Sequence, residues 1–220
     1  MINKMKVLLA PALLAVALPA QAVLIDFTST EWAGVNGEET YTNDVAGIGD
    51  VTLRANVGTL TFNGNEGPGA IGGLVGDGDG IGIKKHGDRD EINNPQGGDK
   101  IEKLTVTFDA SVVIDEILVL DLFNNEYLGY RLKPGPYADS PFIPAGPGSA
   151  GGAGFLSILT GFDSTDRTSW IQFTVPQGAG DDSDQDFALA GLRVTAVPEP
   201  RTLALLGLGL LGLARIRKRV

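Results

Sequence analysis

The fold of this chain is decided by the stretch Leu104-Thr105-Val106-Thr107-Phe108 and by two apolar runs that follow it, Val112 to Ile114 and Ile117 to Phe123. In the first stretch, Leu104, Val106 and Phe108 alternate with threonines, which is the pattern of a strand with one buried face. The two runs are too apolar for a strand with one solvent-exposed face, and they indicate central strands covered on both sides. This segment therefore predicts the middle of a β-structure.

Shorter stretches on both sides show similar alternation, and no stretch between residues 23 and 197 keeps the apolar period of a helix. They are separated by clusters of Gly, Asn, Asp and Pro, which favour turns. The expected strands are 23–28, 51–55, 60–62, 81–84, 127–132, 155–159, 171–175 and 187–195. They predict an all-β domain at 23–195, a single antiparallel β-sandwich, jelly-roll-like, with the last strand paired near the first. The expected core residues are Leu104, Val106, Phe108, Leu118, Leu120, Phe173 and Val194.

The composition excludes most catalytic and nucleic-acid-binding classes. The chain has no cysteine and a single histidine, His86, which excludes thiolate zinc sites, cysteine nucleophiles and sites that need two imidazoles. No Gly-x-Ser-x-Gly elbow is present. Residues 23–197 contain 10 basic and 26 acidic residues, and the net charge of −16 repels nucleic acid. We therefore expect a protein that is not an enzyme and has no nucleic-acid partner.

Residues 1–22 have the three parts of a secretory signal peptide. A start with Lys4 and Lys6 leads into apolar residues 7–18, and Ala20 and Ala22 then form an A-x-A cleavage site. The 12 apolar residues rise only about 18 Å as a helix, whereas the hydrocarbon core of a bilayer is about 30 Å thick. We expect an N-terminal signal helix, cleavage after Ala22 and an exported protein.

Residues 196–220 form a second targeting signal. Pro198-Glu199-Pro200 interrupts regular structure, residues 203–214 predict a short hydrophobic helix, and residues 215–219 are a basic cluster. Basic residues stay on the cytoplasmic side, so the Pro-Glu-Pro element and the domain before it face outward. The apolar segment is short for a span, which predicts a transient inner-membrane insertion ended by cleavage. A plain membrane tail is the alternative, although it would not need the Pro-Glu-Pro element.

These three parts, in order from Val197 to Arg219, resemble the PEP-CTERM sorting signal of exopolysaccharide-producing Gram-negative bacteria. The resemblance implies that Pro198, Glu199 and Pro200 are recognised by exosortase, a polytopic membrane protease with a cysteine nucleophile. It also implies cleavage near the motif and transfer of the protein to the cell envelope, the surface or the extracellular matrix. Arg201 differs from the family pattern, which more often has a small polar residue there.

An acidic, glycine-rich region is the candidate metal site. Carboxylates come from Asp77, Asp79, Asp88, Asp90 and Glu91, and the glycines between them let the backbone bend, so the region has the oxygen chemistry that Ca²⁺ requires. An EF-hand loop does not match, because Ile81 occupies a ligand position. Asp and Gly are also the ordinary residues of solvated turns, and this second interpretation stays open.

The first hypothesis for function is an exported surface or matrix protein, sorted through exosortase, non-enzymatic and associated with exopolysaccharide or biofilm. A calcium-dependent carbohydrate-binding module is the second hypothesis, and a polysaccharide-active enzyme with two carboxylates is the third. Extracellular polysaccharide is thus an expected partner besides exosortase. We expect Tyr127, Tyr130 and Tyr137 on a sugar-binding surface, and Trp32 and Trp170 in the core.

Overall fold

The computed structural model describes residues 21–63, 72–76, 78–85, 91–93, 101–123, 126–132, 142–144, 154–175 and 186–197, with Gly207 and Gly209. These residues form β-strands and one short 3-10 helix, η1 (Thr30–Val35). The strands are β1 (Ala22–Asp26), β2 (Thr40–Val45), β3 (Gly49–Ala55), β4 (Thr59–Asn63), β5 (Gly80–Lys84), β6 (Ile92–Asn93), β7 (Lys103–Leu120), β8 (Tyr127–Arg131), β9 (Phe142–Pro144), β10 (Leu156–Leu159), β11 (Thr168–Thr174) and β12 (Asp186–Ala196).

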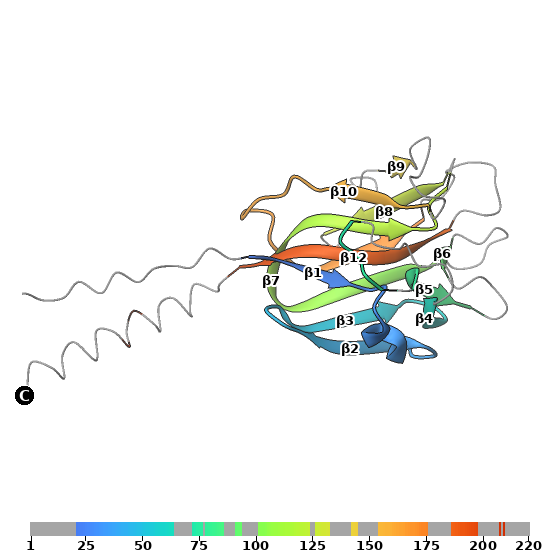
Figure 1. Ribbon diagram of the computed structural model, residues 1–220, viewed down its shortest axis with the longest axis horizontal. Helices are drawn as coiled ribbons and strands as arrows, with labels where there is room; N and C mark the ends of the chain where they lie inside the picture. Colours follow the sequence, from blue (N-terminus) through green and yellow to red (C-terminus); the bar gives the residue numbers. More distant parts are fainter. Residues whose placement is uncertain are drawn as a thin grey trace, which may run out of the picture.

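The strands form one large antiparallel sheet of nearly barrel-like shape (Figure 1). Its main path runs β4-β5-β12-β7-β11-β8-β9. Five more strands join from the side: β1 and β6 pair with β12, β10 pairs with β7, and β3 connects β2 to β7. The all-β, antiparallel prediction is therefore confirmed.

The long strand β7 organises this sheet. Its first half, up to Phe108, pairs with β3 and with most of β11, whereas its second half, from Val112, pairs with β12 and β10. β7 curves between its halves and carries the sheet back over itself (Figure 1). Its partners change between Phe108 and Val112, with a register shift against β11, which assigns this bend to residues 109–111. The expected sandwich of two separate sheets is therefore replaced by one sheet whose two layers are joined through β7.

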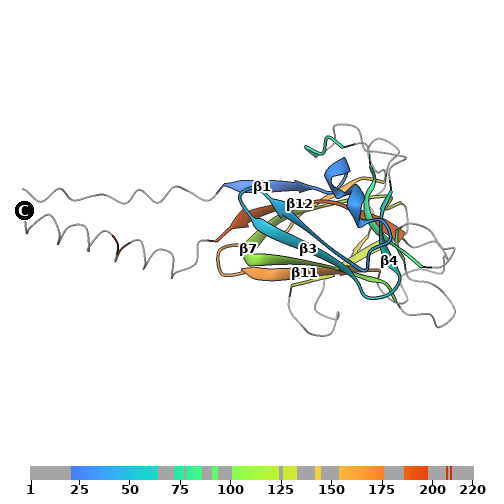
Figure 2. The same ribbon diagram turned by 90° about the horizontal axis from the view of Figure 1, so that it is seen from below.

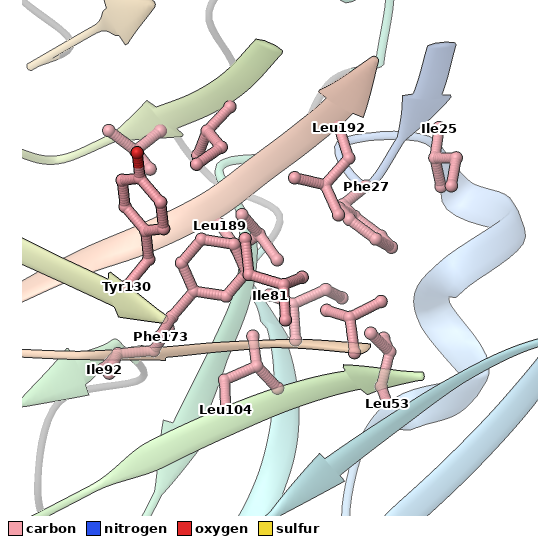
Figure 3. Close-up of a cluster of buried hydrophobic side chains, with 14 of the residues drawn as sticks. Ile25, Phe27, Leu53, Ile81, Ile92, Leu104, Tyr130, Phe173, Leu189 and Leu192 are labelled. Carbon is pink, nitrogen blue, oxygen red and sulfur yellow. The ribbon is translucent and has the colours of Figure 1, made fainter. Parts of the chain in front are cut away.

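The main core lies between the two halves of the sheet. Leu104 and Phe173 on one side meet Leu189 and Leu192 on the other (Figure 3). The seven expected core residues, Leu104, Val106, Phe108, Leu118, Leu120, Phe173 and Val194, are all buried. Leu118 and Leu120, however, belong to a smaller cluster with Leu74 and Ala190. This second cluster explains why the end of β7 is apolar on both faces.

The eight shorter expected strands are present as β1, β3, β4, β5, β8, β10, β11 and β12. The stretches 104–108, 112–114 and 117–123, expected as separate strands, are largely one strand that ends at Leu120, because residues 109–111 bend without leaving the β conformation. β2 was not expected: it pairs with β3 at one side of the sheet, and its exposed positions are polar. The expected pairing of the last strand near the first is confirmed, since β12 pairs with β1.

The expected signal helix and C-terminal hydrophobic helix fall outside the described residues, apart from Gly207 and Gly209, which are too few to show a helix. Among the described residues, no helix has the length and apolar character needed to cross a membrane.

Candidate functional site

Both ends of the described domain leave from neighbouring strands. β1 and β12 are antiparallel, and Ala22 lies opposite Thr195 while Val23 lies opposite Val194. The start of β1 and the end of β12 therefore lie together at one end of the molecule, as Figures 1 and 2 show. Ala22 belongs to the expected signal-cleavage site, whereas its partner Ala20 lies outside the described residues. One end of the fold thus carries Ala22, from the expected signal-cleavage site, and the end of the strand that leads to the C-terminal segment.

This end, which we call the exit end, is built from the bend of β7 and from neighbouring turns. The backbone N–H of Val197 donates to the carbonyl oxygen of Ser111, in the bend, at 3.1 Å. The turn between β2 and β3 lies beside β1, because a Cβ placed on Gly47 would be 3.4 Å from the Val23 side chain. Val197 is the residue directly before Pro198. The Pro-Glu-Pro element therefore starts one residue after a main-chain contact with the domain.

Polar side chains fasten β12 to its neighbours near this end. The Arg193 guanidinium donates from Nε to Oε2 of Glu116 at 3.0 Å, and the Ser157 hydroxyl donates to the other carboxylate oxygen. Thr195 Oγ1 donates to Asp115 Oδ2 at 2.8 Å. Burial of Glu116 acts to raise its pKa, but the hydrogen bonds from Ser157 and Arg193, with the positive charge of Arg193, outweigh it and lower the pKa. One carboxylate thereby joins β7, β10 and β12.

The candidate calcium residues are only partly within the described structure. Asp79 is buried, with 2% of its surface exposed, and Glu91 is half-buried, whereas Asp77, Asp88 and Asp90 lie outside the described residues. Among the described residues, no group of three or more acidic, His or Cys side chains is arranged to hold a metal ion. Asp79 itself is not a solvated turn residue, and calcium binding by this region stays a prediction.

The glycine-rich segment before Asp79 packs against the end of β1. The Asp26 carboxylate accepts from the N–H groups of Val75 and Thr28, and Thr28 Oγ1 accepts from the Gly76 N–H. A Cβ on Gly76 would lie 2.0 Å from the Thr28 carbonyl oxygen, so only glycine fits this approach. Gly76 therefore has a packing role.

Two aromatic side chains, Trp170 and Tyr130, lie in positions that differ from the expectation. Trp32 is buried, in edge contact with Phe27 at 4.8 Å between ring centroids, as expected. Tyr130 is also buried, and burial raises the pKa of its phenol. Trp170 is instead half-buried on the outer face of β11, with the Arg131 guanidinium 5.8 Å from its ring centroid. Tyr127 is half-buried, and Tyr137 lies outside the described residues.

The described residues thus form a β-sheet domain whose first and last strands are paired, and the C-terminal segment follows the last strand in sequence. Residues 196–219 match the PEP-CTERM protein-sorting motif, and the chain carries this motif at its C-terminus. The matched range includes Pro198, Glu199 and Pro200, which lie outside the described residues. No curated protein and no solved structure matches the chain. The motif indicates an exported protein that is processed at the membrane by exosortase and sorted to the cell envelope or surface.

Proposed function

We propose that this protein is a non-enzymatic component of the cell surface or extracellular matrix that becomes part of an exopolysaccharide or biofilm layer. The observation that carries the proposal is the sorting motif at residues 196–219, placed directly after the last strand of a β-domain. The pairing of β1 with β12 supports it, because a domain held by one end leaves its opposite end available to the outside.

The sorting step is tested by substitution of the motif. In a host that contains the exosortase, the combined variant Pro198→Ala, Glu199→Ala and Pro200→Ala should remain uncut and membrane-held, since the substitutions leave the apolar segment unchanged. The measurement is the intact mass of the protein from each cell fraction. Arg201→Ala is the matched control, and we expect it to be processed. Normal processing of the triple variant would contradict recognition through Pro-Glu-Pro.

Association with the matrix is tested separately. Cells that produce the processed protein are treated with an enzyme that depolymerises their exopolysaccharide, and the protein released into the medium is quantified. We expect release with the active enzyme and none with heat-inactivated enzyme. Retention of the protein after complete depolymerisation would contradict the proposed association.

A carbohydrate-binding module is the second candidate function. It is favoured by one observation, the half-buried Trp170 with Arg131 on the outer face of the sheet. Aromatic rings bury large apolar areas at binding surfaces, and sugar rings present an apolar face to them. Calcium is not needed for this interpretation.

A further inference from the structure

The outer face of the layer formed by β2, β3, β7, β11 and β8 carries two rows of side chains in register; β3, β7 and β11 lie side by side in Figure 2. The first row runs across four strands and consists of Thr42, Thr52, Thr107 and Trp170. The second crosses five strands and consists of Thr40, Arg54, Thr105, Gln172 and Arg131. We call these two rows the threonine face. With strands about 4.8 Å apart, the second row is about 19 Å long, enough for several sugar rings.

Hydrogen bonds between neighbours hold part of this face in a fixed arrangement. Arg131 donates from Nε and a terminal nitrogen to Gln172 Oε1 at 3.1 and 2.7 Å. Gln172 Nε2 donates to Thr105 Oγ1 at 2.8 Å, and the Thr42 and Thr52 hydroxyls are 2.8 Å apart. The Arg131 guanidinium also lies beside the Trp170 ring. A surface held in this way loses little side-chain freedom when it binds a ligand.

The charge of the face differs from that of the rest of the domain. Residues 23–197 have a net charge of −16, yet the two rows contain two arginines and no acidic residue, and the nearest acidic pair on the same face, Asp44 opposite Asp50, lies beyond the first row, on the side away from Arg54. Arg54 is exposed and Arg131 is half-buried, so both lie at the surface. Guanidinium groups match carboxylates in geometry and charge. A ligand with carboxylates is attracted by the second row, which holds both arginines, and repelled by the acidic remainder of the surface, Asp44 and Asp50 included.

We propose that the threonine face binds an acidic polysaccharide chain, with a sugar ring stacked on Trp170 and carboxylates near Arg131 and Arg54. The inference rests on the proposed function and names the surface and the chemical class of the ligand. Threonine hydroxyls and the Gln172 amide supply hydrogen bonds to sugar hydroxyls along the rows. The chain lies across the strands, because both rows run in that direction.

The test uses the full chain after processing, with alginate as the acidic probe and dextran as the neutral one. We expect binding to alginate, measured by calorimetry, that weakens as sodium chloride is added, and no binding to dextran. Trp170→Ala and Arg131→Ala should each weaken alginate binding by about tenfold, equal to about 1.4 kcal/mol. Lys84→Ala removes a positive charge from the exposed end of β5 instead and should bind as the parent does. Melting curves check that each variant folds.

Tryptophan fluorescence gives a second readout, because the chain has two tryptophans and Trp32 is buried. Alginate should protect Trp170 from acrylamide quenching, and the effect should disappear in Trp170→Phe. Equal affinity for dextran and alginate would overturn the acidic ligand class. Unchanged affinity in folded Trp170→Ala and Arg131→Ala would overturn the site, while release by depolymerisation would still support the proposed function. Absence of binding to alginate would overturn the inference in the same way.

Discussion

Asp26 and Thr28 show how two polar side chains at the end of a strand fix a segment distant in sequence. Their oxygens accept hydrogen bonds from the backbone of Val75 and Gly76, and Thr28 is fully buried. Gly78 completes the contact by donating to the Thr28 carbonyl at 3.1 Å. The segment in turn places Leu74 over Leu118 and Ala190. These hydrogen bonds hold the segment around Leu74 in place, and this segment covers the apolar outer face of the sheet at Leu118 and Ala190.

Gly76→Ala should destabilise the domain by about 1–3 kcal/mol, because the new Cβ meets backbone that has little freedom to move. Thermal unfolding measures the effect. Gly34→Ala is the matched control: its Cβ meets the tip of the Tyr41 side chain at 2.8 Å, which can rotate away. We expect a change of less than about 0.5 kcal/mol there. Equal effects of the two substitutions would show that the Gly76 contact is not specific.

Glu116→Gln should lower stability at neutral pH by about 0.2–1 kcal/mol, the range of a partly exposed ion pair. The folded-state pKa of Glu116 is lowered, so the unfolded state binds the proton more tightly. The stabilisation is therefore complete above the ordinary value of 4.5 and is lost as the pH falls through the folded-state pKa. Urea unfolding of both proteins between pH 7 and pH 3 should show the difference shrinking. A difference that grows in acid would contradict this assignment.

At the scale of elements, the segment from residue 76 to 91 gives the calcium prediction. If Asp77, Asp79, Asp88, Asp90 and Glu91 hold Ca²⁺, calcium at 100 times its dissociation constant should stabilise the folded state by about 2.7 kcal/mol. Melting curves with a chelator and with millimolar calcium measure this. Asp77→Asn with Asp88→Asn should abolish the shift, and these two substitutions leave buried Asp79 unchanged. Identical melting curves for the parent protein would favour a segment without metal.

The sequence predicted the strands well where one face of a strand is buried. Leu104, Val106 and Phe108 all point into the core, as their alternation indicated. The continuity of β7 was not predictable, because a bend at Asp109-Ala110-Ser111 and a turn have similar composition. β2 was missed since Tyr41 and Val45 are only half-buried. The alternation that places Val106 inside also places Thr105 and Thr107 outside, but their alignment with Gln172 and Trp170 depends on pairing between distant strands.

At the scale of the whole molecule, the contact of Val197 with Ser111 leaves little room between the folded domain and the motif. Four residues, Gly-Ser-Gly-Ser, inserted between Val197 and Pro198 should therefore speed processing. The spacer increases the distance between the folded domain and the motif, so the exit end no longer restricts access of the membrane enzyme to the motif. Pulse-chase labelling in the native host measures the rate. As the control, the same four residues are added within the turn Asn56–Gly58, between β3 and β4. This insertion should leave the rate unchanged. A slower rate with the spacer at Val197 would show that the enzyme uses the folded end for recognition.

The position of β12 also has a consequence for biosynthesis. β12 is the last strand to be synthesised, yet it lies in the middle of the sheet, between β7 on one side and β1, β5 and β6 on the other. A chain that is exported with its N-terminus first cannot complete this sheet until residue 196 has crossed the inner membrane. Contacts between such distant segments also form slowly. Until then the edges of β1 and β7 remain open to wrong partners and to proteases. Folding and arrival of the sorting motif at the membrane therefore coincide, and a newly exported chain depends on protection during that interval.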